Sequence, residues 1–179
     1  MNILTIPGLW NSGPLHWQTH WEAAHPEWRR VQQRNFDRPD RDEWIATLDA
    51  AVRSCDEPPL LAAHSLGCSL VTHWNEVTGG AGVAGAFLVG PSDVEAPGYP
   101  EEGRSFAYMS KQRLPFPSIV IASTNDEFVS VDRARAFADA WGSRLTFIGE
   151  AGHINGASGY GPWPEGERLL LDFAQTLTR

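Results

Sequence analysis

Short apolar runs recur along the chain, separated by longer segments in which apolar residues return every three or four positions. The short runs are rich in Val, Ile, Leu and Ala, a composition typical of strands that are buried on both faces of a sheet. The pattern predicts six strands, near residues 2–6, 28–33, 59–64, 83–89, 117–123 and 144–148. The segments between them predict helices with one apolar face, over residues 14–25, 41–54, 66–77, 131–141 and from Pro164 onward.

Alternating strands and helices indicate an α/β fold with a mainly parallel sheet covered by helices on both faces. The whole chain, residues 1–179, is expected to form one domain, because no repeat, low-complexity segment or linker interrupts it. No segment is long enough for a separate cap domain.

The segment 91–117 is the irregular part of this pattern. It is rich in proline, glycine and charge and shows no strong helical period. A connection of this length is usually functional or mobile. Two interpretations stay open: a cover whose Phe106, Tyr108 and Met109 line a pocket, or a solvated surface loop.

A candidate nucleophile follows the third apolar run. The residues Ala63-His64-Ser65-Leu66-Gly67 form a small-x-Ser-x-Gly sequence between a predicted strand and a predicted helix. This is the pattern of a nucleophile elbow, a tight turn that holds the serine in a strained backbone conformation with its hydroxyl exposed. Ala63 stands where glycine is usual, so the motif is imperfect. The sequence predicts Ser65 as the nucleophile.

A base and an acid follow in the order that an α/β-hydrolase requires. Asp126 comes just after the predicted strand 117–123, and His153 comes just after the last one. Because the carboxyl ends of parallel strands meet at one edge of the sheet, these side chains should lie near Ser65. His153 would accept the serine proton, and Asp126 would orient the imidazole. Asp93, after the fourth strand, is the alternative acid.

The chain resembles the YdeN and retinoblastoma-binding-protein-nine family of small serine hydrolases, within the α/β-hydrolase superfamily. The matching stretches span essentially the whole chain: Ile6-Pro7-Gly8, His64-Ser65-Leu66-Gly67, Leu114–Ser118 with Ala122–Asp126, Gly152–Asn155 and Ser158–Gly166. The resemblance implies a six-stranded α/β-hydrolase fold of strand order 2-1-3-4-5-6 and a triad of Ser65, Asp126 and His153. It also implies hydrolysis of esters or related acyl compounds without a cofactor, and a role for His64 in shaping the elbow.

The oxyanion that forms when the serine attacks needs two preorganised donors, usually backbone N–H groups. One is expected from Leu66, at the start of the helix after the nucleophile. By analogy with the superfamily the other is Leu9, with Trp10 as the alternative.

Aromatic residues beside the predicted site are candidates for substrate binding, while most other aromatic and histidine residues are expected to pack or lie at the surface. The substrate-binding candidates are Trp10, Phe106 and Trp163, although Trp163 would equally serve to anchor the loop that carries His153. Packing or surface roles are expected for four of the six histidines, His16, His20, His25 and His73, and for Trp17, Trp21, Trp28 and Trp44.

Composition narrows the range of partners. The chain has 14 Lys and Arg against 22 Asp and Glu, a formal charge of −8, with no basic block. This argues against nucleic acid and anionic membranes as partners. The two cysteines show no metal or redox spacing. We expect no metal or cofactor, a small-molecule acyl substrate and, since neither a leader pattern nor an apolar run of membrane-spanning length is seen, a cytoplasmic location.

Three functional hypotheses follow. The first is a serine hydrolase, in particular a carboxylesterase for small acyl groups, with peptidase, thioesterase or amidase action as variants on the same site. The second is a hydrolase-fold interaction module with weak catalysis, which an intact Ser, Asp and His set disfavours. The third is a flavodoxin-like binding protein, which the lack of a phosphate-binding pattern in the first loop disfavours.

Overall fold

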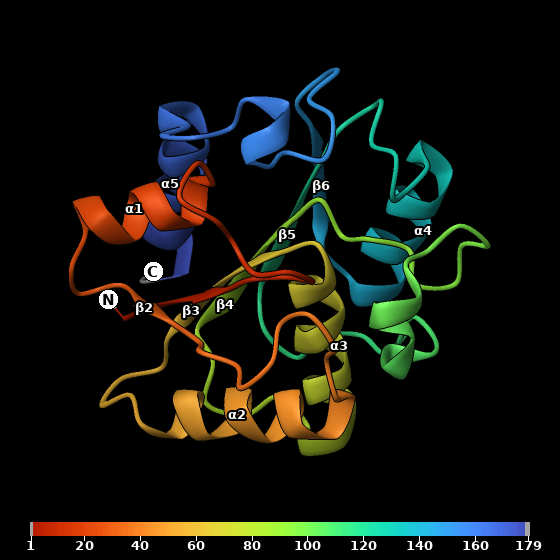
Figure 1. Cartoon of the computed structure of the whole chain (residues 1–179). Helices are drawn as coiled ribbons and strands as arrows, with labels where there is room; N and C mark the ends of the chain where they lie inside the picture. The colour runs from red at the N-terminus through yellow and green to blue at the C-terminus, as the bar shows by residue number, and fades with distance from the viewer. Residues whose placement is uncertain (1, 178–179) are drawn as a thin grey trace.

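Six parallel strands form one sheet in the computed structural model, which describes residues 2–177 (Figure 1). Their order is β2-β1-β3-β4-β5-β6, and every neighbouring pair is parallel, as predicted. Their bounds are β1 Ile3–Ile6, β2 Arg29–Arg30, β3 Leu60–His64, β4 Gly85–Val89, β5 Ser118–Ala122 and β6 Arg144–Phe147. β2 is shorter than predicted because two arginines occupy it at the edge of the sheet, where only β1 pairs with it.

Five α-helices connect and cover the strands. They are α1 Trp17–Ala24, α2 Arg41–Arg53, α3 Leu66–Thr78, α4 Val131–Trp141 and α5 Pro164–Leu177. Side chains cap the first turns of α2 and α4: Asp40 accepts the N–H of Glu43, and Ser130 accepts the N–H of Arg133. α1 begins later than predicted because the ring of His16 caps it and accepts a hydrogen bond from the N–H of Gln18.

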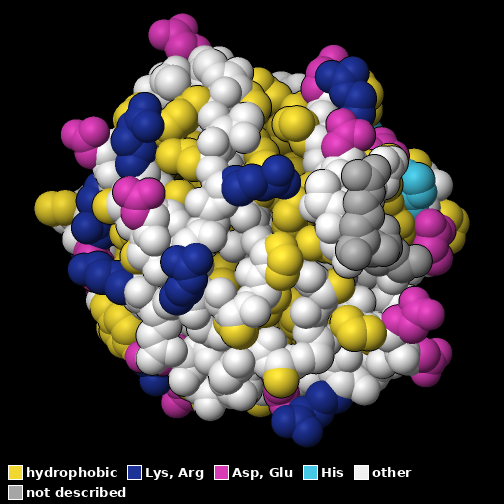
Figure 2. All heavy atoms as spheres, turned by 180° about the vertical axis from the view of Figure 1, so that it is seen from behind, with side chains coloured by type: hydrophobic (Ala, Val, Ile, Leu, Met, Phe, Trp, Pro, Cys, Tyr) yellow, Lys and Arg dark blue, Asp and Glu magenta, His cyan; other side chains and the backbone are white. Residues whose placement is uncertain are grey.

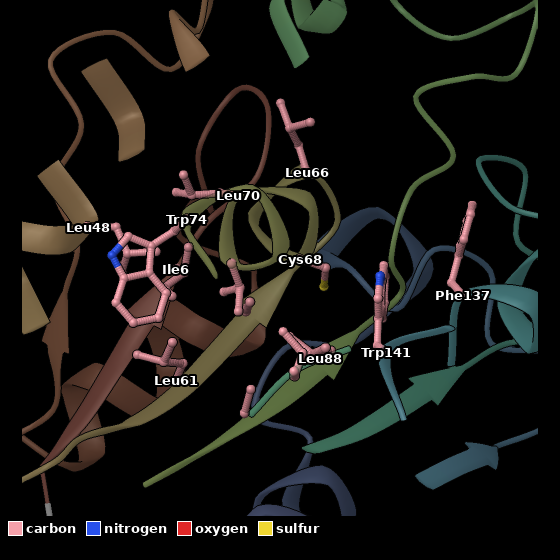
Figure 3. Close-up of a cluster of buried hydrophobic side chains, with 14 of the residues drawn as sticks. Ile6, Leu48, Leu61, Leu66, Cys68, Leu70, Trp74, Leu88, Phe137 and Trp141 are labelled. Carbon is pink, nitrogen blue, oxygen red and sulfur yellow. The ribbon is translucent and has the colours of Figure 1, made fainter. Parts of the chain in front are cut away.

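The helices form two layers around the sheet (Figure 1): α1 and α5 pack on one face, and α2, α3 and α4 on the other. On the second face, Ile6, Leu61 and Leu88 of neighbouring strands belong to one buried cluster with Leu70 and Trp74 of α3 (Figure 3). All of these side chains are at most 1% exposed, so the core fixes the position of α3 relative to the strands.

The segment 91–117 is anchored to the rest of the protein. It contains a short 3₁₀ helix, Glu101–Phe106, whose Phe106 is fully buried against Trp44 and His73. Near the start of the segment, Asp93 pairs with Arg133 of α4. Neither interpretation from the sequence describes this segment fully: Phe106 is buried in the core, and Ser110 and Leu114 are hydrogen-bonded to Trp141 of α4.

The surface carries both signs of charge. On the face seen in Figure 2, basic and acidic side chains are interspersed rather than gathered into one block. Within residues 2–177, no helix is both long enough and apolar enough to cross a lipid bilayer.

Candidate active site

Ser65 lies between β3 and α3 in a strained backbone conformation. Its φ is 56° and its ψ is −122°, a region that residues other than glycine rarely adopt. Such strain persists only where surrounding contacts hold it, and it is concentrated at functional sites. The sharp strand–turn–helix geometry of the elbow motif is therefore present.

Two glycines allow the backbone around the elbow to pack closely. A Cβ on Gly67 would lie 2.4 Å from the carbonyl oxygen of Ile6 and 2.9 Å from that of Pro7. A Cβ on Gly8 would lie 2.9 Å from the Cβ of Ser65 and 3.0 Å from the nitrogen of Leu66. The loop after β1 thus lies directly against the elbow.

We expect Gly67→Ala to destabilise the protein by about 1–3 kcal/mol, because the added methyl group meets backbone atoms that have no rotamer to change. Chemical denaturation followed by circular dichroism measures this loss. Gly98→Ala is the matched control, since nothing lies within 4 Å of a Cβ at that position, and its effect should stay within about 0.5 kcal/mol. Equal stability of the two variants would contradict the close packing at the elbow.

Ser65, His153 and Asp126 form a continuous hydrogen-bonded chain. The Oγ of Ser65 is 2.8 Å from Nε2 of His153, and Nδ1 of His153 is 2.9 Å from both carboxylate oxygens of Asp126. The Asp126 side chain is fully buried and that of His153 is 6% exposed. Asp126 also accepts the N–H of Phe128 at 2.8 Å, which gives the buried carboxylate a further donor.

Asp93, the alternative acid, is engaged elsewhere. Its carboxylate accepts two hydrogen bonds from the guanidinium of Arg133, at 2.6 and 3.0 Å. Arg133 also pairs with Glu95, and these carboxylates raise its pKa. The structure therefore brings Asp126, and not Asp93, to His153.

This arrangement supports nucleophilic chemistry. An imidazole that donates its Nδ1–H to a carboxylate keeps a lone pair on Nε2, which here faces the serine hydroxyl. It can accept the hydroxyl proton when the oxygen attacks, and the carboxylate stabilises the imidazolium that forms.

The backbone distinguishes the two candidates for the second oxyanion donor. The N–H of Trp10 already donates to the carbonyl of Phe36 at 2.9 Å. The N–H of Leu9 has no acceptor within residues 2–177, and Leu9 lines the cavity beside Ser65. Leu66 stands at the first position of α3, where an N–H has no partner within the helix. Leu9 and Leu66 thus keep donors free at this edge of the sheet.

A cavity of about 260 Å³ opens over Ser65 and His153. Trp10, a candidate for substrate contact, is 51% exposed and lines this cavity. Most of the other residues that line the cavity are apolar or uncharged. These other residues are Leu9, Asn11, His16, His64, Tyr99, Pro100, Glu127, Phe128 and Asn155.

Phe106 and Trp163, the other two candidates for substrate contact, do not line this cavity. Phe106 is directed into the core beneath the segment 91–117. Trp163 is 7% exposed and packs against Trp17 and Trp21, with ring centroids 5.7 and 5.8 Å apart. Trp163 therefore has the anchoring position that the sequence left open for it.

Several residues at the site were missed in the sequence. Tyr99 reaches the cavity from the segment 91–117, and Phe128, two residues after Asp126, lies with its ring 4.5 Å from that of His153. His16, expected at the surface or in packing, is 6% exposed, lines the cavity and contacts His64. No local signal marks His16, because its partner is 48 residues away in the chain.

The described part of the chain holds no metal centre, and the cysteine nearest the proposed nucleophile is buried. No group of three His, Cys, Asp or Glu residues within 2–177 is placed to hold a metal ion. Cys68, three residues after the nucleophile, is fully buried, and burial raises the pKa of its thiol. Its position is that of a small apolar core residue.

Comparisons with known proteins agree with this geometry. A family model described as serine hydrolase matches residues 3–172. A YdeN-like protein from Pectobacterium atrosepticum has a similar structure, with a TM-score of 0.87, 35% identity and coverage of 98% of this chain and 91% of that one. The ydeN gene product of B. subtilis matches with a TM-score of 0.74 at 21% identity, over 97% of this chain and 98% of that one.

The fold is shared more widely. An esterase from Rhodococcus sp. ECU1013 matches with a TM-score of 0.66 at 16% identity, over 99% of this chain and 90% of that one. At this identity the likeness shows the α/β-hydrolase fold alone. No curated protein sequence matches the chain.

Proposed function

Because the chain belongs to the serine hydrolase family, within the α/β-hydrolase superfamily, we propose that it cleaves small carboxylic esters or related acyl compounds through an acyl-enzyme formed on Ser65. The observation that carries this proposal is the hydrogen-bonded chain from Ser65 through His153 to the buried Asp126, at the base of an open cavity. The proposed substrate is a small molecule, and the reaction uses no cofactor.

In the first half of the proposed reaction, Oγ of Ser65 attacks the carbonyl carbon of the ester while its proton passes to Nε2 of His153. The N–H groups of Leu66 and Leu9 donate to the oxyanion of the tetrahedral intermediate. Asp126 stabilises the imidazolium. When the carbon–oxygen bond to the leaving group breaks, that oxygen takes the proton from His153, and an alcohol and an acyl-serine result.

In the second half, water takes the place of the alcohol. His153 removes a proton from the water as it attacks the acyl carbonyl, and the same two N–H groups receive the oxyanion. Collapse of this intermediate breaks the bond to Oγ, which takes the proton back from His153. The carboxylic acid leaves and Ser65 is regenerated.

The cavity limits the size of the acyl group. Leu9, Tyr99 and Phe128 offer apolar contacts within about 260 Å³, and no arginine or lysine among residues 2–177 lines the cavity. A compact, uncharged acyl group fits this lining better than a long or anionic one, because a long chain would extend beyond the walls into solvent.

We expect kcat/KM for aryl esters to peak at short acyl chains. Each methylene that becomes fully buried contributes about 0.8 kcal/mol, so activity rises only while the cavity has room for another. A p-nitrophenyl ester series of increasing acyl length, with the Ser65→Ala protein as the blank, measures this. Steadily rising kcat/KM out to the longest soluble chain would contradict it. Parallel assays with a thioester and an arylamide of the preferred acyl group rank the competing substrate classes.

A further inference from the structure

Two histidines outside the proposed triad form a hydrogen-bonded relay that ends on the backbone of His153. Nε2 of His64 is 2.9 Å from the carbonyl oxygen of His153. Since a carbonyl only accepts, His64 carries its proton on Nε2 and has a lone pair on Nδ1. That lone pair faces Nε2 of His16 at 3.2 Å, so His16 is the donor there. Nδ1 of His16 in turn accepts the N–H of Gln18, also at 3.2 Å.

Each tautomer in this relay is fixed by its neighbour. The residues His16 and His64 are 6% and 5% exposed. Burial, together with Arg30 and His153, lowers the pKa of His16 to about 3. Burial also lowers the pKa of His64 well below its ordinary value, with His16 and His153 adding to the effect. Both rings therefore stay neutral near neutral pH. Protonating either ring would make two N–H donors face each other, and the hydrogen bond between them would be lost.

The loop that carries His153 needs such support because part of its backbone is strained. Ile154 has a φ of 49°, a left-handed conformation that is costly for a β-branched residue. The indole of Trp17 donates to the carbonyl of Ile154 at 3.0 Å. Two consecutive carbonyls of this loop are thus held from outside it, one by β3 through His64 and one by α1 through Trp17.

We propose that His16 and His64 are positioning residues for His153. The relay from the start of α1 through both rings holds the carbonyl of His153, and with it the imidazole that stands 2.8 Å from Ser65. His16 acts on His64 as Asp126 acts on His153, since it selects the tautomer that can make the next bond. This inference rests on the proposed role of His153 as the base.

The chain offers variants that separate positioning from simple structural support. Asn is a strong N-cap, so His16→Asn keeps an acceptor for the N–H of Gln18 but is too short to reach His64. His64→Gln retains a donor at the position of Nε2, whereas His64→Leu removes it. His73→Asn is the matched control: His73 is also buried, and its Nε2 is 2.9 Å from a backbone carbonyl, that of Tyr108.

We expect His16→Asn to lower kcat for an aryl ester roughly 10- to 100-fold, because a small misplacement of a reacting group has effects of this size. KM should change much less than kcat, because Asn still lines the cavity at this position and the other lining residues are unchanged. His64→Leu should match or exceed this loss and His64→Gln should recover part of it. His73→Asn should lower the Tm without a selective loss of kcat. Wild-type kcat in His16→Asn, or an equal loss in His73→Asn, would overturn the proposal.

A measurement on the wild-type protein tests the relay independently of turnover. Nitrogen-15 NMR of histidine-labelled protein, assigned through the His16→Asn and His64→Gln variants, reports which ring nitrogen carries the proton. Both rings should be neutral Nε2–H tautomers from about pH 5 to pH 8, while ordinary histidines titrate in that range. An Nδ1–H tautomer, or titration of either ring in that range, would overturn the relay. If Ser65 proved dispensable, the proposed function would fail while this NMR result could stand.

Discussion

Ser65→Ala should lower kcat for an aryl ester by roughly four to six orders of magnitude, because the nucleophile and its base act as a unit. KM should change little, since the cavity keeps its walls. Alanine retains the Cβ and fits the same turn, so the Tm should also change little. Stopped assays at high enzyme concentration, together with thermal denaturation, measure both quantities.

Ser69→Ala provides the matched control for this loss. Ser69 lies one helical turn further along α3, where its hydroxyl is buried and faces the sulfur of Met109 at 3.4 Å. Its removal should leave kcat close to wild type. Substantial turnover by carefully purified Ser65→Ala protein would mean that another group is the nucleophile.

Asp126→Asn should lower kcat roughly 10⁴-fold, as the corresponding change does in a well-studied protease. The amide would donate toward Nδ1 of His153 and favour the tautomer with its proton on Nε2, which cannot accept a proton from Ser65. Because the change is nearly isosteric, the fold should be retained, and circular dichroism with steady-state kinetics would show it.

Asp93→Asn should have the opposite profile. Asp93 is 8% exposed at its side chain and holds Arg133 through two hydrogen bonds. Weakening that pair should cost roughly 2 kcal/mol of stability, typical of a hydrogen bond to a charged group, with kcat nearly unchanged. A dead Asp93→Asn protein beside a nearly normal Asp126→Asn protein would place the acid after β4 instead of β5.

Hydrophobic periodicity predicted most of the fold because the four inner strands of the sheet are buried on both faces. The runs that became β3, β4 and β5 are buried along their whole length and were located within two residues. The length of β2 was overestimated. An edge strand needs few apolar residues, and its length depends on the strand that pairs with it. The strand order followed from the family resemblance together with crossover handedness.

The candidate site, like the fold, was predictable only in part from local sequence. The sequence predicted that Ser65, Asp126 and His153 lie close together, because the carboxyl ends of parallel strands share one edge of the sheet. The choice of Leu9 over Trp10 depends on the distant carbonyl of Phe36, which no local pattern indicates. Phe106 belongs to the segment 91–117 and Trp163 follows His153 by ten residues, but packing directs both side chains away from the cavity.

The tryptophans of α1 also make contacts that local sequence does not reveal. Their spacing predicted one packed face of a helix, and both rings are buried. The sequence did not show that the indole of Trp17 donates to Ile154, or that the indole of Trp21 donates to the carbonyl of Pro162 at 2.8 Å. These bonds tie α1 to the loop after β6, and they exist only once the sheet has brought the two segments together.

Covalent labelling tests the proposed chemistry most directly. A fluorophosphonate reacts with a serine only where a base and an oxyanion site activate it, so one probe examines the nucleophile, His153 and the two N–H donors together. Incubation with the probe, digestion and mass mapping should give one adduct, on Ser65, which forms slowly in Asp126→Asn and is absent from Ser65→Ala. An adduct on a different residue, or equal labelling of the Ser65→Ala protein, would contradict the proposed acyl-enzyme.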